Sequence, residues 1–504
     1  MVKPTILDSR GNPIRTSPAS PPRVPIRARY DAAQTTDENR RWWAQADNLS
    51  ARAANDPVTR LKLRTRARYE VANNSWAHGI ADSLADYMVG DGPMLQMLTE
   101  DALLNRRVEA DYSRWSAAAR IAEKLWVMQR AKIVDGENFG LLTNNPGLPG
   151  RVQLDLALIE SDQVATPYPA LGPLAVDGIQ LDTHGNPVEY HLLRSHPGDG
   201  LAYNLGGQFD RVDARNVIHW FKPDRPGQYR GIPELTPALE LFAQLRRYRM
   251  AVLAAAETAA DFAALLESEL PPAGDDEDDE SINAFSSTEI ERRMMTTLPK
   301  GYKLAQLRAE QPTTTYEMFV RQLLTEIARC LCVPYAIAAG DYSNHNYSSG
   351  RLDNQSFHRG LAVERSRLEL GVLDRIFAAW LAEMTALGQV PADLDRWPHR
   401  WLWPGMEHVD PEKEANATTA RLQNYTTTYS DECQKQGVDP ESRAQQIARD
   451  VALFEGLGLR HPYQAGSPAG SPSTPGASNE QPPQAAARGH RFDLEARDRR
   501  NGHA

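Results

Sequence analysis

The spacing of apolar residues predicts helices on both sides of one β-rich stretch. In the first part of the chain, apolar positions recur at every fourth residue, which places them on one face of a helix predicted over about 56–88. Gly90, Gly92 and Pro93 follow and end this helix. A second helix is predicted over about 111–133. The apolar face of the first helix consists of Trp76, Ile80, Leu84 and Met88.

Between about 132 and 221 the pattern changes to short runs of β-favouring residues. Two of these runs flank Thr183–Pro187, where glycine and asparagine accept a positive φ, so this segment predicts a hairpin. The predicted strands are Phe139–Thr143, Val152–Leu156, Ile179–Asp182, Val188–Leu193 and Val217–Phe221.

Long helices are predicted in the second half of the chain. Helix-favouring residues continue from Pro233 to Leu270, and at 1.5 Å per residue this helix would be roughly 50 Å long. A capping box at Thr314–Glu317 opens the next helix, which Pro334 closes. A polar loop over 340–350 precedes another long helix, over about 353–387. Its apolar stripe is Leu368, Val372, Ile376, Trp380 and Met384.

The predicted fold class is α+β, mainly helical, with a small β domain and two short helical patterns that run to Leu459. The Pro, Ser and Gly content of 1–28 and 464–504 predicts flexible arms. The most apolar run, Ala251–Leu266, is too short and too interrupted by acids to cross a bilayer, so we expect no membrane span. The sequence contains no internal repeat.

Charge and motifs narrow the function. The net charge of −10 argues against a protein that coats DNA, because nonspecific binding depends on Lys and Arg neutralising phosphates. No Walker A, HExxH, GxSxG or GxGxxG motif or EF-hand loop is present, so we expect no catalytic residues and no cofactor. Histidines in the β region lack tight metal-ligand spacing, so we expect no metal. They are His184, His191, His196 and His219.

Three cysteines cannot form an even disulfide framework, which favours a reducing compartment. Cys330 and Cys332 are interpreted as thiols that pack in the core. Trp42, Trp43 and the tryptophans at 397–403 are likewise interpreted as packing residues.

The charge is distributed unevenly. The first 70 residues carry 14 Lys and Arg against 7 Asp and Glu, a net of +7, which leaves −17 for the remaining 434. The basic residues of the first helix are candidates for contact with DNA, scaffold or capsid protein. We favour the simpler reading of a solvated helix face with ion pairs between subunits. These residues are Arg60, Lys62, Arg64, Arg66 and Arg68.

Several segments together resemble the lambda-type family of tailed-phage portal proteins, over about residues 27–460. Each segment is weakly specific alone, but five in the same order over this length are specific. One position departs from the family pattern: Cys332 stands where a glycine often precedes the Val-Pro pair. The segments are Ala67–Asn74, Arg225–Glu234, Val333–Tyr335 with Gly340–Asp341, Asn346–Ser349 and Asp410–Glu414.

The resemblance implies a homo-oligomeric ring, usually of twelve subunits, at the portal vertex of a virion, assembled in the host cytoplasm. Double-stranded DNA would pass through its channel without sequence specificity, driven by the terminase large subunit. Capsid or scaffold protein and head-completion or tail connector proteins would be further partners. The implied parts are an arm (1–28), wing (29–233), first stem helix (234–270), clip (271–312), second stem helix (313–333), tunnel loop region (334–352), long wing helix (353–396), crown (397–463) and tail (464–504).

The resemblance also suggests two functional segments. The tunnel loop would face DNA through Asp341, Tyr342, Ser343, Asn344, His345, Asn346, Tyr347, Ser348 and Ser349. Residue physics alone favours an ordinary helix connection here; the position in the family favours the loop. The clip contains Asp275, Asp276, Glu277, Asp278, Asp279 and Glu280, which would dock the motor or repel DNA at the channel mouth, or else form a solvated loop.

Two other functions remain open from the sequence. A hydrolase could use Asp341, Ser343, His345, Ser348 and Ser349, and it would be a compact monomer. A head–tail adaptor or minor capsid protein would form rings without affinity for terminase.

Overall fold

The computed structural model describes residues 36–167, 174–199, 208–260, 264–268, 302–306, 313–343, 347–391, 397–405 and 410–459. The chain divides into two compact units, Met1–Asp439 and Pro440–Ala504. In the second unit the described part is mainly helix α13 (Pro440–Gly456). The predicted arms at 1–28 and 464–504 lie outside the described residues. No described helix has the length and hydropathy needed to cross a membrane.

The N-terminal helices are α1 (Ala51–Ala54), α2 (Pro57–Asn73), α3 (Ser75–Val89), α4 (Ala102–Ala118) and α5 (Ile121–Asp135). Two single helices predicted from the sequence are therefore each broken. Asn74 has an extended backbone and caps both neighbours, because its N–H donates to Glu70 and its side chain accepts from the N–H of Trp76. Arg120 separates α4 from α5 in the left-handed region, at φ 55°.

The predicted apolar face of α3 is confirmed. Ile80 and Met88 are buried, and Trp76 and Leu84 pack against the same core.

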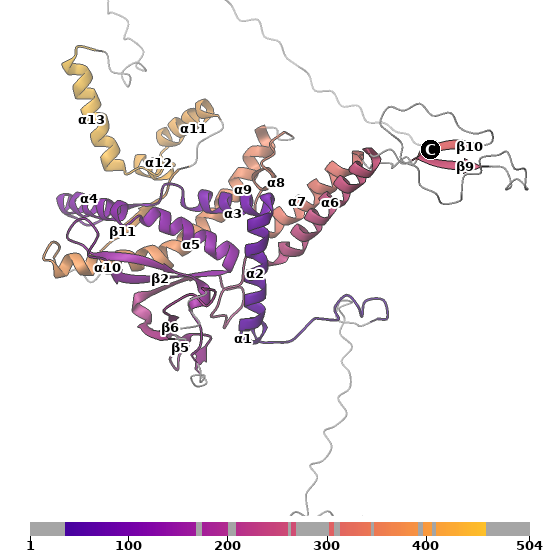
Figure 1. Ribbon diagram of the computed structural model, residues 1–504. Helices are drawn as coiled ribbons and strands as arrows, with labels where there is room; N and C mark the ends of the chain where they lie inside the picture. The colour runs from indigo at the N-terminus through magenta and orange to yellow at the C-terminus, as the bar shows by residue number, and fades with distance from the viewer. Residues whose placement is uncertain are drawn as a thin grey trace, which may run out of the picture. The chain divides into compact units, whose positions relative to one another are not determined.

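The β region forms two antiparallel sheets beside these helices (Figure 1). β2 (Glu137–Asn144) lies between β3 (Leu154–Ile159) and β8 (Val217–Phe221), and α5 packs against β2. The second sheet has the order β4 (Ala175–Val176), β5 (Ile179–Leu181), β6 (Pro187–Leu193) and β7 (Phe209–Asp213). The predicted hairpin is confirmed: β5 pairs with β6, and Gly185 has φ +85° in the turn.

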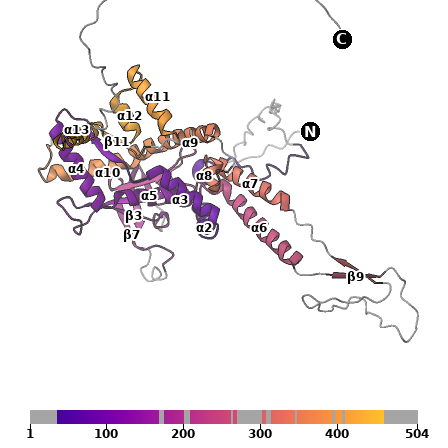
Figure 2. The same cartoon turned by 90° about the horizontal axis from the view of Figure 1, so that it is seen from above.

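The long helices differ from the prediction at their ends. α6 (Leu239–Ala260) has 22 residues and is therefore roughly 33 Å long, not 50 Å. The last residues assigned to it form β9 (Ala264–Ser268), because they pair with β10 (Tyr302–Gln306) and nonlocal pairing overrides local helix propensity. α7 (Thr313–Cys330) lies beside α6, as Figures 1 and 2 both show.

After α7 come α8 (Tyr335–Ala339), α9 (Tyr347–Leu368) and α10 (Asp374–Ala386), with a π turn at Glu369–Leu373 between the last two. α9 thus begins six residues before the predicted start. β11 (His399–Leu402) pairs with β1 (Met94–Met97), and α11 (Pro411–Gln423) and α12 (Tyr429–Lys435) follow. With α13 there are three helices where the sequence predicted two patterns.

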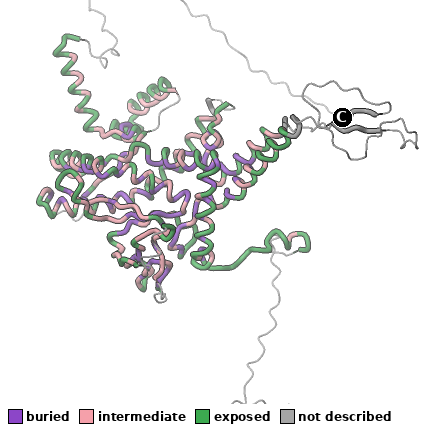
Figure 3. Tube along the Cα trace, viewed as in Figure 1, coloured by how far each residue is buried: buried purple, intermediate pink, exposed green. Residues whose placement is uncertain are grey.

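The main core is shared by α3, α5, α10 and the turn before α10. Figure 3 shows the buried residues running through the interior of this part of the chain. The predicted stripe from Leu368 to Met384 is buried throughout, and Trp380 packs against Tyr112 and Phe377 with ring centroids 5.3 and 6.1 Å away. Trp397 and Trp401 are buried, as predicted. The packing reading was wrong for Trp42 and Trp43, which are 72% and 50% exposed and contact each other edge to face.

A buried ion cluster joins the helices to both sheets. Glu137, the first residue of β2, is completely buried, and its carboxylate accepts hydrogen bonds from the Arg230 guanidinium at 2.7 and 3.0 Å. Arg64 of α2 lies 3.3 Å from the same carboxylate, and the His219 ring nitrogen lies 3.1 Å from it. Burial raises the pKa of Glu137, but the charge of Arg230 and the contact with His219 outweigh it and hold that pKa well below its usual value.

Backbone contact between two glycines makes this cluster possible. The N–H of Gly231 donates to Glu137 at 2.7 Å. A Cβ on Gly231 would collide with the carbonyl oxygen of Gly136, and Gly136 itself has φ +89°. The predicted solvated face of α2 is thereby corrected for Arg60 and Arg64, which are buried and pair with carboxylates of the same chain.

The end of α7 shows why related proteins often have glycine at the position of Cys332. This residue has φ +55°, its N–H donates to the carbonyl of Arg329, and the N–H of Val333 donates to that of Ala328. These two bonds define a Schellman cap, whose left-handed position favours glycine. The prediction that Cys332 packs in the core was wrong, since it is exposed; Cys330 is partly buried against the core.

We predict that Glu137→Gln lowers the free energy of unfolding by about 3–5 kcal/mol, because it leaves buried guanidinium groups uncompensated. Urea denaturation measures this. The control, Glu123→Gln, removes an exposed carboxylate paired with Arg120 and is expected to cost less than about 1 kcal/mol. Equal effects of the two substitutions would contradict the role given to the cluster.

The Glu137→Gln variant should also change how the stability of the protein depends on pH. The lowered pKa of Glu137 contributes stability above its ordinary value of 4.5, and this is lost as the pH falls further. Burial lowers the pKa of His219 below 6.5, so the unfolded chain binds that proton first and stability also declines below pH 6.5. We expect the acid limb of stability against pH to be flatter in Glu137→Gln.

We predict that Cys332→Gly stabilises the protein by about 0.5–1 kcal/mol, because glycine adopts the left-handed region without steric cost. The control is Cys330→Gly in the last turn of α7, which should destabilise by about 1 kcal/mol. Both are measured by denaturant unfolding. A destabilising Cys332→Gly would show that the thiol, not the backbone, matters at this position.

Candidate functional site

The polar loop after α8 begins with an ordered turn. Gly340 ends α8 at φ +65°, and Asp341 then accepts hydrogen bonds from the N–H and the hydroxyl of Ser343, at 3.0 and 2.6 Å. The Tyr342 hydroxyl makes a hydrogen bond with Tyr87 of α3. Partial burial and this contact raise the pKa of Tyr342. The first half of the loop is therefore attached to α3.

The remaining loop candidates are placed only in part. Asn344, His345 and Asn346 lie outside the described residues. Tyr347 and Ser348 belong to the first turn of α9, and Ser349 is exposed one residue later. The Ser343–Asp341 contact serves the turn. Nucleophilic activation would additionally require a base on the hydroxyl, and the candidate base, His345, is among the residues not described.

The α6–α7 pair carries apolar side chains on its outside. The two helices pack through Tyr248, which lies 5.7 Å from Tyr316 and 4.5 Å from Phe319 between ring centroids. Exposed residues nevertheless line both helices (Figure 3). The large apolar ones are Met250, Leu253, Met318 and Phe319. A helix pair with apolar residues on the outside suits contact with another protein surface. The acidic run at 275–280, between these helices in sequence, lies outside the described residues.

Charge pairs fix the base of this helix pair. Lys132 of α5 is 1% exposed, and its Nζ lies 3.2 Å from Glu234, just before α6, and 2.8 Å from Glu364 of α9. It also lies over the ring of Trp220 at 4.9 Å. Sequence reasoning missed this group, although Glu234 ends one of the segments that carry the family resemblance.

The basic residues of α2 divide between its two sides. Arg60, Arg64 and Arg68 follow one another at four-residue spacing on one side of the helix. Arg60 and Arg64 face Glu137 of the ion cluster, and Arg68 lies 2.7 Å from the carboxylate of Asp135. Lys62 and Arg66 are exposed on the opposite side, where contact with DNA, scaffold or capsid protein stays a prediction. The four-residue spacing of these arginines indicated that they share one face of α2. It did not indicate that acidic side chains cover that face.

One histidine lies near two carboxylates. His196 Nε2 is 3.3 Å from Glu160 and 3.5 Å from Asp162, a grouping with metal-ligand chemistry. The guanidinium of Arg68 already lies 3.3 and 2.8 Å from the same two carboxylates. Because a cationic group occupies this position, the arrangement fits an ion-pair network better than a metal site.

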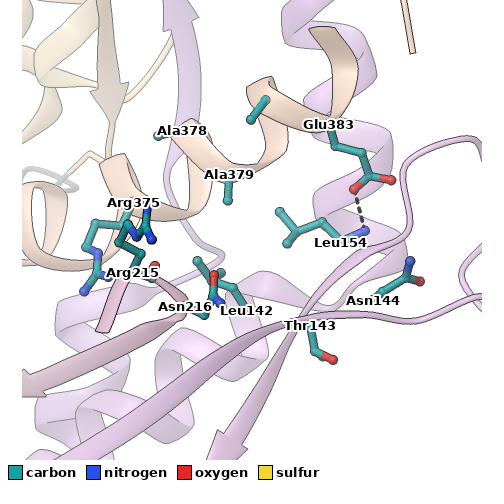
Figure 4. Close-up of a pocket in the computed structure, with 11 residues that line it drawn as sticks. Leu142, Thr143, Asn144, Leu154, Arg215, Asn216, Arg375, Ala378, Ala379 and Glu383 are labelled. Atoms are coloured by element: carbon teal, nitrogen blue, oxygen red, sulfur yellow. Dashed lines mark hydrogen bonds between the residues drawn. The ribbon is translucent and has the colours of Figure 1, made fainter. Parts of the chain in front are cut away.

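A pocket of about 690 Å³ lies between α10 and the β2–β3 sheet. Figure 4 shows residues that line it. The two charged residues of α10 that line it bind backbone groups. Glu383 accepts from the N–H groups of Gln153 and Leu154 at 2.7 and 2.9 Å, and Arg375 donates to the carbonyls of Val217 and Ala214. These contacts therefore join α10 to the sheet.

Comparison with known proteins gives a consistent result. A probable portal protein of Halomonas phage phiHAP-1 is 25% identical over 429 residues, which cover 80% of this chain and 82% of the relative. Portal protein B of Escherichia phage lambda is 23% identical over 325 residues, 57% of this chain and 60% of the relative.

Solved structures with similarity include the neck of an empty gene transfer agent particle (16% identity, TM-score 0.48, 77% of this chain and 98% of that one). A second is an HK97 family phage portal protein from Corynebacterium diphtheriae (14% identity, TM-score 0.31, 69% and 97%). The model of the family described as phage portal protein, lambda family, matches residues 36–365. The chain therefore belongs to the lambda family of phage portal proteins.

Proposed function

We propose that copies of this chain form a closed ring at one capsid vertex, through which DNA is packaged and later leaves. The observation that carries the proposal is the α6–α7 pair, whose exposed Met250, Leu253, Met318 and Phe319 need a covering surface. In a ring of identical subunits the same heterologous contact repeats until it closes. Membership of the portal family supports this reading.

The work of moving DNA falls to a separate terminase motor. The chain lacks a Walker A sequence, so its role is geometric. The α6–α7 pair acts as the stem, and the segment between the two helices acts as the clip that docks the motor and later the head-completion and tail proteins. The tunnel loop, residues 341–349, is the segment assigned to contact with DNA, and residues 29–233 form the wing, which contacts capsid or scaffold protein.

We predict that Leu253→Asp abolishes ring formation, because a carboxylate would be buried in an apolar contact. Mass photometry and negative-stain microscopy measure the size and shape of the particles. The control is Leu103→Asp on α4, which is 76% exposed and lies away from the stem pair in sequence. If Leu253→Asp still forms rings, the α6–α7 pair does not form the interface between subunits.

The acidic run yields a separate prediction. Replacing Asp275, Asp276, Glu277, Asp278, Asp279 and Glu280 by Asn and Ser should weaken terminase docking and reduce DNA packaging in vitro, because the substitution removes the charge complementarity of the docking surface. The rings should still form. If docking and packaging are both unchanged, the acidic run is a solvated loop with no role in docking.

A further inference from the structure

The exposed side of α9 divides into two stripes. Phe357, Leu361 and Leu368 bury the opposite side of the helix in the core. At 100° per residue, one exposed stripe, named here the polar stripe, consists of Arg351, Gln355, Arg359, Ala362 and Ser366. The neighbouring apolar stripe includes Leu352 and Val363, which are 66% and 52% exposed.

The polar stripe is basic and unneutralised. None of the exposed residues of α9 is acidic, although the whole chain has a net charge of −10. The two acids of the helix, Asp353 and Glu364, are half-buried, and Glu364 pairs with Lys132 and Arg367. Within the part of the chain that the structure describes, Arg351 and Arg359 form no ion pair. Two guanidinium groups are thus left available to an anion.

The side chains around these arginines shape the surface. Ser356, Gly360, Ala362 and Ser366 are small and exposed, so they allow a broad partner to approach the helix closely. The polar stripe contains no aromatic or large apolar residue of the kind that anchors protein–protein contacts. The apolar stripe beside it suits a second copy of the chain, which would leave the polar stripe uncovered.

We infer that the polar stripe of α9 contacts the phosphates of double-stranded DNA without sequence specificity. The inference rests on the proposed function, which brings this polyanion to the protein. Arg351 and Arg359 are eight residues apart, roughly 12 Å along the helix. Duplex DNA carries one charge per about 1.7 Å of its axis, so both groups find phosphates in any sequence. Few cations per subunit keep each contact weak and sensitive to salt, which permits movement.

The test uses the full chain and a fluorescently labelled 40-base-pair duplex of random sequence. Fluorescence anisotropy gives the binding constant between 50 and 200 mM NaCl for the wild type and for Arg351→Gln/Arg359→Gln. Because two arginines per subunit no longer neutralise phosphates in this variant, the slope of log K against log salt should fall in magnitude by about 1.8 for each subunit that contacts the duplex. Arg351→Lys/Arg359→Lys, which keeps the charge, should retain most of the slope.

The control is Arg107→Gln/Arg114→Gln, which removes the same charge from exposed positions on α4 and should leave the slope unchanged. Particle size is measured in the same samples. Wild-type chains that stay monomeric contradict the proposed function. Intact rings with an unchanged slope in Arg351→Gln/Arg359→Gln contradict the inference alone. Loss of rings in that variant, but not in the control, assigns the stripe to a subunit contact and overturns the inference.

Discussion

The carboxylate of Glu137 inside its shell of arginines is the constraint on which the fold depends. A buried charge of this kind is tolerated only when its partners are all present, since one missing partner leaves several kcal/mol uncompensated. The partners come from α2, from β8 and from the segment that ends at Glu234. Helices, sheet and the segment that leads into α6 are therefore positioned by one group of contacts. Gly136 and Gly231 permit the close backbone approach that this group requires.

Further ion pairs connect the Glu137 cluster to α6 and α9, the helices that carry the proposed functional surfaces. Arg230 binds Glu137, and four residues later Glu234 pairs with Lys132, which also holds Glu364 of α9. Arg246 of α6 binds Glu70 of α2 at 2.8 Å. The start of α6 and the helix that carries the polar stripe are thus both attached to the buried Lys132, and α6 is also attached to α2. A portal subunit needs such attachment, because its proposed mechanism consists of holding surfaces in place around DNA.

Local patterns predicted much of the fold. Four-residue spacing identified α3 and α10, and β propensity with turn residues identified the β5–β6 hairpin. Features that depend on distant residues were missed: α6 stops early because β9 pairs with β10, and Arg60 and Arg64 are buried because Glu137 and Asp162 lie opposite them. The segments that resemble the family contain residues whose structural contacts were not evident from their composition. Arg225–Glu234 supplies Arg230, Gly231 and Glu234, whose roles are contacts and not chemistry.

The candidate site was harder to predict than the fold. It depends on which side chains are exposed and which form ion pairs, and residue spacing predicts neither. Arg351 and Arg359 gave no signal in the sequence until the burial of α9 separated its two sides. The central claim is that identical subunits surround a channel. Cryo-electron microscopy of the purified full chain tests it most directly. The account predicts closed rings with a central opening, with α6 and α7 of adjacent subunits in contact. A compact monomer, or rings in which these helices face solvent, would contradict it.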